Sequence, residues 1–419
     1  MTALLFASCD PEETKHYPSV PEDHGETGNE TEVKELKIVA ATKQGTLLRT
    51  SCADPSMVYH NGEYYLTMTG SSNIAVVHDA DLSNLTTSAH STSSNLVYQS
   101  ARDTSVPEIF GSGAVISGTW SPELHYFSED DCPGNAGWYM VFGLRLDNGN
   151  SSVIRPVVLK SLGSTPAGPW GHPVSGVRGK TQRFLDAAGD PFNEWAVGFS
   201  FLRISTGQYK GIYATWVDEV GRGQGLGKFY QRLRIAKLKT PWQVDSEAAT
   251  ITQPTQDWEK KGASATLPQV VEGGTALYGA HGEIYMAYCG SGYWSDYGLG
   301  QLTLKREGGD YADPLKTESW IKYSGNPVFS SRTTDFLRGA GHAFFFKDAN
   351  DNDLMCYHAY PFVNGKKADG RNAYVETYTI DYSATSETAP QGLIRFGLTG
   401  TGVTAPLSSS FNYYKAEEL

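Results

Sequence analysis

Apolar and aromatic residues alternate with polar ones in short runs along this chain, and tight polar turns join the runs in pairs. Residues 54–70 show the pattern clearly, with an apolar run, the turn around Asn61-Gly62 and then an aromatic run. Alternation with a period of two predicts β-strands, and a short turn between two of them predicts a hairpin. The same pattern predicts four further hairpins, in residues 120–143, 195–216, 272–290 and 341–360.

These five hairpins are copies of one unit. They recur at intervals of about 65 to 80 residues, which suits a four-stranded blade with sizeable loops. The amphipathic helices that a parallel α/β sheet would need are not evident between them. The sequence therefore predicts an all-β fold, a five-bladed β-propeller over residues 36–419. Its last blade is expected to close by pairing strands from both ends of the domain, with residues 374–381 as one candidate strand.

Composition and charge agree with this fold and exclude one class of partner. Aromatic residues make up 12% of the chain and charged residues 19%, and there are 45 glycines, which favours short strands and tight turns over helices. The formal net charge is −12, and residues 10–35 alone hold nine acids against two lysines. Nucleic acid is therefore excluded as a partner, because phosphate binding needs a basic face.

The N-terminal residues are typical of an exported protein. Residues 1–9 form a short apolar run that ends in small residues and Cys9, which resembles the end of a bacterial lipoprotein signal. The alternative is a short tail with an incidental cysteine. Residues 10–35 have the composition of a disordered tether. We expect a monomer in the periplasm or on the cell surface, in contact with a membrane only through a lipid anchor at Cys9.

Two acids stand at the heads of matching hairpins, Asp54 in the first and Glu272 in the fourth. Because the innermost strand of each propeller blade starts at the central channel, the heads of the hairpins should converge at one end of it. Each acid taken alone fits an ordinary turn residue. Together they predict one shared site, and paired carboxylates are the usual equipment for cleaving a glycosidic bond.

Four short motifs at blade starts carry a resemblance to a known family. They are Ala53-Asp54-Pro55, Trp-Ser-Pro-Glu-Leu-His at 120–125, Glu272-Gly273 and Gly341-His342. In order and spacing the chain resembles glycoside hydrolase family 43, inverting enzymes that act on arabinose- and xylose-containing polymers. The resemblance implies that Asp54 is the general base, that Glu272 is the general acid and that no cofactor is required. Too few residues follow the fifth unit for the β-sandwich of the family's xylosidases, which favours an arabinan- or arabinofuranoside-type member.

One position departs from the family pattern. The family places a third acid, an aspartate that tunes the general acid, in a Trp-x-Ile-Asp-Gly run on the third blade. Here the matching run is Trp195-Ala-Val-Gly198, with glycine at the place of the aspartate. Asp186 and Asp190 lie just upstream and are the candidate replacements. Without a replacement, the alternative is a propeller that binds surface glycans and has lost the chemistry.

Several residues are candidates for holding substrate or a metal ion. Trp120, Glu123, Tyr293 and Trp294 are assigned to substrate binding. The aromatic faces among them can stack on sugar rings, although tryptophans also fill propeller cores. His342 resembles a channel histidine that the family places near a hydrated cation. Calcium would be the ion, held mainly by waters because it prefers oxygen ligands. A buried core histidine is the alternative.

Overall fold

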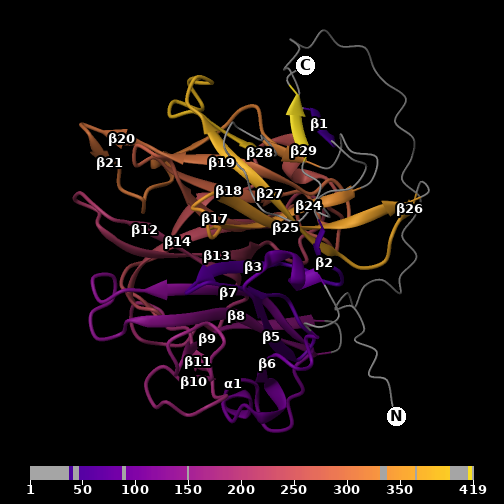
Figure 1. Cartoon of the computed structure of the whole chain (residues 1–419), viewed down its shortest axis with the longest axis vertical. Coiled ribbons are helices and arrows are strands. Elements are labelled where there is room, and N and C mark those ends of the chain that lie inside the picture. The colour runs from indigo at the N-terminus through magenta and orange to yellow at the C-terminus, as the bar shows by residue number, and fades with distance from the viewer. Residues whose placement is uncertain are drawn as a thin grey trace.

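The computed structural model describes residues 37–40, 47–86, 91–148, 151–330, 337–363, 366–396 and 414–417 (Figure 1). The sequence predictions for residues 1–9 and 10–35 lie outside these ranges. Within them, no helix combines the length and the apolar character needed to cross a membrane.

Five antiparallel sheets follow one another along the chain. The first has the order β3-β4-β5-β6 and the second β10-β9-β8-β7, with β11 beside β9. Their strands are β3 (Ser56–His60), β4 (Glu63–Thr67), β5 (Asn73–Asp79), β6 (Leu96–Gln99), β7 (Gly118–Phe127), β8 (Gly137–Asn148), β9 (Ser151–Ser161), β10 (Trp170–Gly171) and β11 (Gln182–Arg183). Each of these two sheets is one blade built around a predicted hairpin.

The third and fourth sheets repeat the arrangement, with orders β12-β13-β14-β15 and β17-β18-β19-β22, while β16 pairs with β14 and β23 with β19. Their strands are β12 (Val197–Ile204), β13 (Gly211–Val220), β14 (Tyr230–Thr240), β15 (Gln243–Val244), β16 (Ala249–Thr252), β17 (Val271–Tyr278), β18 (Ile284–Gly290), β19 (Gly298–Leu304), β22 (Trp320–Lys322) and β23 (Phe329–Ser330). Every residue of β18 and β19 is buried, because blades pack against both faces of these strands.

The fifth sheet closes the ring with strands from both ends of the domain. β2, near the N-terminus, pairs with β27 through Leu47–Tyr374 and Arg49–Ala373, so the predicted closure and its candidate strand are both confirmed. In Figure 1 the indigo β2 accordingly lies close to β24 and β25 of the same sheet. The strands are β2 (Leu47–Arg49), β24 (Leu337–Lys347), β25 (Asp353–Val363), β26 (Lys366–Lys367), β27 (Asn372–Asp381) and β28 (Leu393–Phe396).

A few short elements lie outside the blades. They are the paired strands β1 (Lys37–Ala40) and β29 (Tyr414–Glu417), the hairpin β20 (Arg306–Glu307) and β21 (Asp310–Tyr311), the helix α1 (Val106–Phe110), and the 3-10 turns η1 (Leu82–Thr86), η3 (Ser100–Arg102), η4 (Asp257–Lys260) and η5 (Thr317–Ser319). The prediction of an all-β, five-bladed propeller is confirmed.

The core lies between neighbouring blades. One cluster of buried residues brings Val197 and Val217 of the third blade against Val271 and Met286 of the fourth. Such interdigitation fixes the angle between blades, and with it the positions of the strand heads at the channel.

Candidate active site

The first strand of every blade has a kinked head. One residue at each head has a positive φ: 51° at Asp54, 48° at Ser121, 62° at Gly198, 59° at Gly273 and 51° at His342. In β7, β12, β17 and β24 the pairing register shifts at this point, as it does in a β-bulge. The kink turns the side chains of the strand heads toward the mouth of the channel.

The repeat also corrects one detail of the sequence interpretation. Asp54 occupies the kinked position of its blade, whereas the equivalent residue of the fourth blade is Gly273. Glu272 comes one residue earlier, where β17 still pairs with β18 through Cys289. The two acids therefore share one mouth but leave the backbone from different positions.

Asp54 lies among groups that favour its ionised form. The Thr69 hydroxyl donates a hydrogen bond to Oδ2 at 2.6 Å, and an Arg371 guanidinium nitrogen lies 3.3 Å from Oδ1. The ring nitrogens Nδ1 of His358 and His342 are 3.1 and 3.5 Å from the same oxygen. Burial by itself would raise the pKa of Asp54, but His342, Arg371 and His358 outweigh it and hold that pKa well below its ordinary value.

Glu272 lies in the opposite kind of environment. Its Oε1 accepts a hydrogen bond from the buried Tyr297 hydroxyl at 2.8 Å. Burial raises the pKa of Glu272, and the nearby Asp54 carboxylate adds to the rise, while His342, Tyr297 and Arg371 oppose it. At pH values between the two pKa values, Asp54 can accept a proton while Glu272 still carries one to give.

The position of Tyr297 depends on a glycine of the Gly-His motif. A Cβ at Gly341 would lie 2.5 Å from the Tyr297 ring, so any larger residue would push the ring away. The ring also stacks on His358, with centroids 5.6 Å apart. Gly341 therefore allows the close approach that brings the Tyr297 hydroxyl to Glu272.

Both acids line one cavity of about 200 Å³ at the channel mouth. Aromatic side chains form much of its wall, and three arginines also reach it. These residues are Trp120, Trp195, Tyr293, Trp294, Arg145, Arg222 and Arg371. The Trp294 indole N–H donates to the carbonyl of Gly262 at 3.0 Å, which fixes the ring at the rim. Aromatic faces with polar groups between them are suited to binding a sugar.

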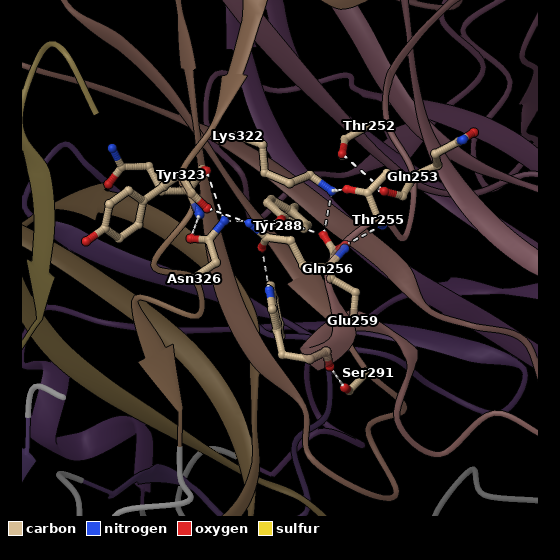
Figure 2. A network of polar contacts seen from close by, with 12 residues as sticks. Thr252, Gln253, Thr255, Gln256, Glu259, Tyr288, Ser291, Lys322, Tyr323 and Asn326 are labelled. Carbon is tan, nitrogen blue, oxygen red and sulfur yellow. Dashed lines mark hydrogen bonds and ion pairs between the residues drawn. The ribbon is translucent and has the colours of Figure 1, made fainter. Parts of the chain in front are cut away.

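A buried ion pair involves the segment that precedes residues 266–268 of the wall. Lys322 Nζ lies 2.6 Å from Oε1 of the fully buried Glu259, and the Tyr288 hydroxyl donates to the same oxygen at 2.7 Å. Oε2 of Glu259 accepts hydrogen bonds from the backbone N–H groups of residues 255 and 256, both at 2.7 Å (Figure 2). With these partners the buried carboxylate is satisfied, and it holds the turn at residues 255–259 in place.

Not all of the predicted site residues reach this cavity. Trp120, Tyr293, Trp294 and His342 line it, together with the two acids. Glu123 does not line it: beyond the kink at Ser121 its side chain is buried and lies 2.8 Å from His125. This finding corrects the assignment of Glu123 to substrate binding.

The upstream aspartates are not brought to the site either. Asp186 and Asp190 line a separate hollow, and the Asp186 carboxylate accepts backbone N–H groups of Ala188 and Asp190 within its own turn. The loop therefore closes on itself instead of folding toward Glu272. This finding corrects the hypothesis that Asp186 or Asp190 replaces the missing third acid.

Several residues of the site were not found from the sequence. Thr69, Tyr297, His358 and Arg371 reach the acids from the first, fourth and fifth blades, and no local motif marks them. Their partners are 15 to 317 residues away along the chain. Only the assembled ring brings them together.

The surroundings of His342 do not provide an inner ligand set for calcium. The oxygen atoms near its Nδ1 belong to Asp54 and Tyr297, both at 3.5 Å, and Asp54 is already paired with Arg371. Among the described residues, no group of three or more His, Cys, Asp or Glu side chains could hold a metal ion. Calcium prefers six or more oxygen ligands, so these residues do not fit a directly bound ion.

Known proteins are related to this chain in sequence or in fold. The profile of the family described as Glycosyl hydrolases family 43 matches residues 45–383. The chain is 27% identical over 331 residues to "Alpha-L-arabinofuranosidase B" of Pyricularia oryzae, covering 76% of this chain and 56% of that protein. It is 27% identical over 325 residues to "Alpha-L-arabinofuranosidase 43" of Humicola insolens, covering 76% and 57%. It thus spans little more than half the length of these relatives.

Two solved structures share the fold. A thermostable family-43 glycoside hydrolase superposes with a TM-score of 0.58 at 18% identity, covering 85% of this chain and 95% of the other. An endo-arabinase from Bacteroides thetaiotaomicron superposes with a TM-score of 0.53 at 14% identity, covering 81% and 98%.

Proposed function

Since the chain belongs to the glycosyl hydrolases of family 43, we propose that it is a glycosidase that cleaves arabinose- or xylose-containing plant polysaccharides. One observation carries the proposal: two carboxyls in one cavity have pKa values shifted in opposite directions. The surroundings lower the pKa of Asp54 and favour its ionised form, whereas they raise the pKa of Glu272 and favour its protonated form. This division of states is what general base and general acid require.

The proposed reaction is a single displacement. Asp54 takes a proton from a water molecule while the oxygen of that water attacks the anomeric carbon. The bond from that carbon to the leaving oxygen breaks, and Glu272 gives its proton to this oxygen. The attack occurs on the face opposite the leaving group, so the released sugar has inverted configuration. Thr69, Arg371 and His358 keep Asp54 oriented, and Tyr297 does the same for Glu272.

For the substrate we propose an arabinan or an arabinofuranosyl-decorated polymer. The names of the two arabinofuranosidases and of the endo-arabinase support this class. The faces of Trp120, Tyr293 and Trp294 in the cavity wall offer stacking surfaces for the sugar rings.

A second candidate function follows from Gly198. If the missing third acid has cost the chain its chemistry, the propeller would bind surface glycans without cleaving them. The two functions are separated by Asp54→Ala and Glu272→Ala variants, assayed with the wild type on aryl arabinofuranosides and arabinan. We expect the wild type to release arabinose and both variants to lose about 10²-fold or more of kcat/KM. Three equally inert proteins that still bind arabinan would refute the hydrolase and favour the binding protein.

We also propose that the reaction needs no cofactor. The two carboxyls supply both proton transfers in this proposal, and the protein oxygens near His342 are too few to hold a directly bound calcium ion. Dialysis against EDTA, followed by activity and melting measurements with and without added Ca²⁺, tests this. Unchanged activity is expected, whereas a loss that Ca²⁺ restores would show a required ion.

As to location and partners, we propose an exported monomer that is anchored through lipidated Cys9 at the cell surface or in the periplasm, and that binds polysaccharide but not nucleic acid. The support is the composition of residues 1–35 and the acidic net charge. Expression of the gene with Cys9→Ser, followed by fractionation and lipid labelling, tests the anchor. If the variant stays in the membrane fraction, the anchor is not at this cysteine.

A further inference from the structure

The head of the third blade is open at the kinked position, where the first, second and fifth blades carry the side chains of Asp54, Ser121 and His342. A Cβ added at Gly198 would meet only the backbone nitrogen of Gly273 and a methyl group of Val217, both at 3.9 Å. Its φ of 62° resembles the 51° of Asp54, where the chain carries an aspartate. The third blade thus has space at its head but no carboxylate there.

A carboxylate from the next strand lines the same cavity. Val217 of β13 pairs with Val197, the residue before Gly198, and Glu219 follows two positions later. Side chains two residues apart on a strand leave the same face, so Glu219 lies on the side of β13 whose Val217 methyl group faces Gly198. Glu219 lines the cavity together with Glu272, and its side chain is only 6% exposed.

One arginine holds this carboxylate. Arg222 Nε donates to Glu219 Oε2 at 2.8 Å, and its Nη2 contacts the same oxygen. The guanidinium also packs over the Phe229 ring, 4.6 Å from its centroid. Arg222 is itself 56% exposed and therefore screened by water, whereas the carboxylate that it holds is buried in the wall of the cavity that Glu272 also lines.

Two buried carboxyls in one cavity resist full ionisation. Burial raises the pKa of Glu219, Arg222 and Gln231 oppose the rise, and Glu272 adds to it. At Glu272 burial raises the pKa most, His342, Tyr297 and Arg371 lower it, and Asp54 is the neighbouring charge that raises it. When one of two neighbouring carboxyls is ionised, its negative charge raises the pKa of the other. The remaining proton therefore stays bound to a higher pH than it would on an isolated carboxyl.

We propose that Glu219 is the positioning residue of the general acid, a carboxylate supplied by the second strand of the third blade in place of the one missing at Gly198. It acts by keeping the proton on Glu272 available at higher pH. The inference rests on the proposed function, in which Glu272 is the general acid. It replaces the hypothesis that Asp186 or Asp190 fills this role.

Two variants of the ion pair test the proposal, because they should act in opposite directions. Glu219→Gln removes the like charge, and the alkaline limb of kcat/KM against pH should move about one unit lower. Arg222→Gln leaves Glu219 unpaired, and the same limb should move higher. Glu307→Gln, at an exposed glutamate of β20, is the matched control and should keep the wild-type profile.

A third variant tests rescue. In the Glu219→Gln background, Gly198→Asp places a carboxylate at the open head, and the alkaline limb should return toward the wild-type position. If Glu219 merely bound a substrate hydroxyl, Glu219→Gln would raise KM with both limbs unchanged, and Gly198→Asp would restore nothing. Either result overturns the proposal. Melting curves of all variants identify any loss of folding.

A titration without turnover separates this proposal from the function on which it rests. The full chain carrying ¹³C-labelled glutamate is titrated by NMR, with the Glu272 carboxyl signal assigned from Glu272→Gln. We expect its midpoint to fall by about one pH unit in Glu219→Gln. An unchanged midpoint would refute the role of Glu219 even in an active enzyme. An inactive wild type with the shifted midpoint would refute the hydrolase and leave the coupling of the two carboxyls standing.

Discussion

The two ends of the central channel are built from the same five strands but differ in backbone and in chemistry. At the head end each strand is kinked, and the cavity holds the carboxyls, histidine and arginines described above. At the tail end the strands pair regularly around a second hollow of about 740 Å³, lined mainly by aromatic and aliphatic side chains. The difference teaches that regular pairing stabilises the ring, while departures from it create the site.

Loss of a head-end acid should have the largest effect on activity. Asp54→Asn keeps the shape of the side chain but cannot accept a proton from water, so kcat should fall about 10³-fold, since a positioned base contributes roughly 10²–10⁴-fold. Initial rates on an aryl arabinofuranoside measure this. The melting temperature should change little, and a variant with more than a tenth of wild-type kcat would show that Asp54 is not the base.

A large tail-end side chain should have the converse effect. Phe127 is 2% exposed and packs against Tyr139 and Phe201 beside the tail hollow. Phe127→Ala should lower the free energy of unfolding by about 3–5 kcal/mol, because it leaves a cavity. Denaturant titration measures the loss, and kcat/KM of the folded fraction should stay within about threefold of wild type. If activity fell as far as in Asp54→Asn, the functional distinction between the two ends would be wrong.

A smaller effect is expected from the cation that supports the base. Arg371 lies 3.3 Å from Asp54 and helps to hold its pKa below the ordinary value. Arg371→Met should therefore raise that pKa, so that Asp54 becomes protonated at higher pH and the acidic limb of kcat/KM moves upward by about one unit. The alkaline limb should rise as well, because Arg371 also lowers the pKa of Glu272 and its removal takes that effect away. A downward shift of the acidic limb would contradict this account of Asp54.

The smallest effect should come from single aromatic rings. Trp294→Ala at the head end should raise KM for arabinan oligomers about threefold to tenfold, since one stacking contact contributes about 0.5–1.5 kcal/mol. Tyr126→Ala is the control at the tail end, where the ring lines the hollow and is 49% exposed. KM should not change in this control. Equal changes in both variants would mean that substrate also binds at the tail end.

The fold could be read from the sequence because its signals are local. Each hairpin carries its own alternation and turn, and residues 374–381, one candidate for the closing strand, lie in β27, which pairs with β2. The identity of the two central acids was also accessible, through the motifs around Asp54 and Glu272. What sequence reasoning missed depends on the angle between blades: the contacts of His358 and Arg371 with Asp54, and the presence of Glu219 in the cavity, cross the ring.

The errors have a physical reason as well. Glu123 belongs to the blade-start motif at residues 120–125, but the kink at Ser121 ends the exposed head before Glu123 is reached. Asp186 and Asp190 were chosen because they are close to Gly198 in the sequence, whereas their turn satisfies the Asp186 carboxylate internally. In both cases distance along the chain was a poor guide to distance from the channel mouth.

The central claim is that Asp54 and Glu272 hydrolyse a glycoside by single displacement at the head end. The most direct test is the configuration of the sugar first released from an α-arabinofuranoside, followed by ¹H NMR in the first minutes, before the anomers interconvert. The account predicts that β-arabinofuranose appears first and that its release stops in Asp54→Asn. Initial release of the α-anomer, or release that Asp54→Asn leaves unchanged, would contradict it.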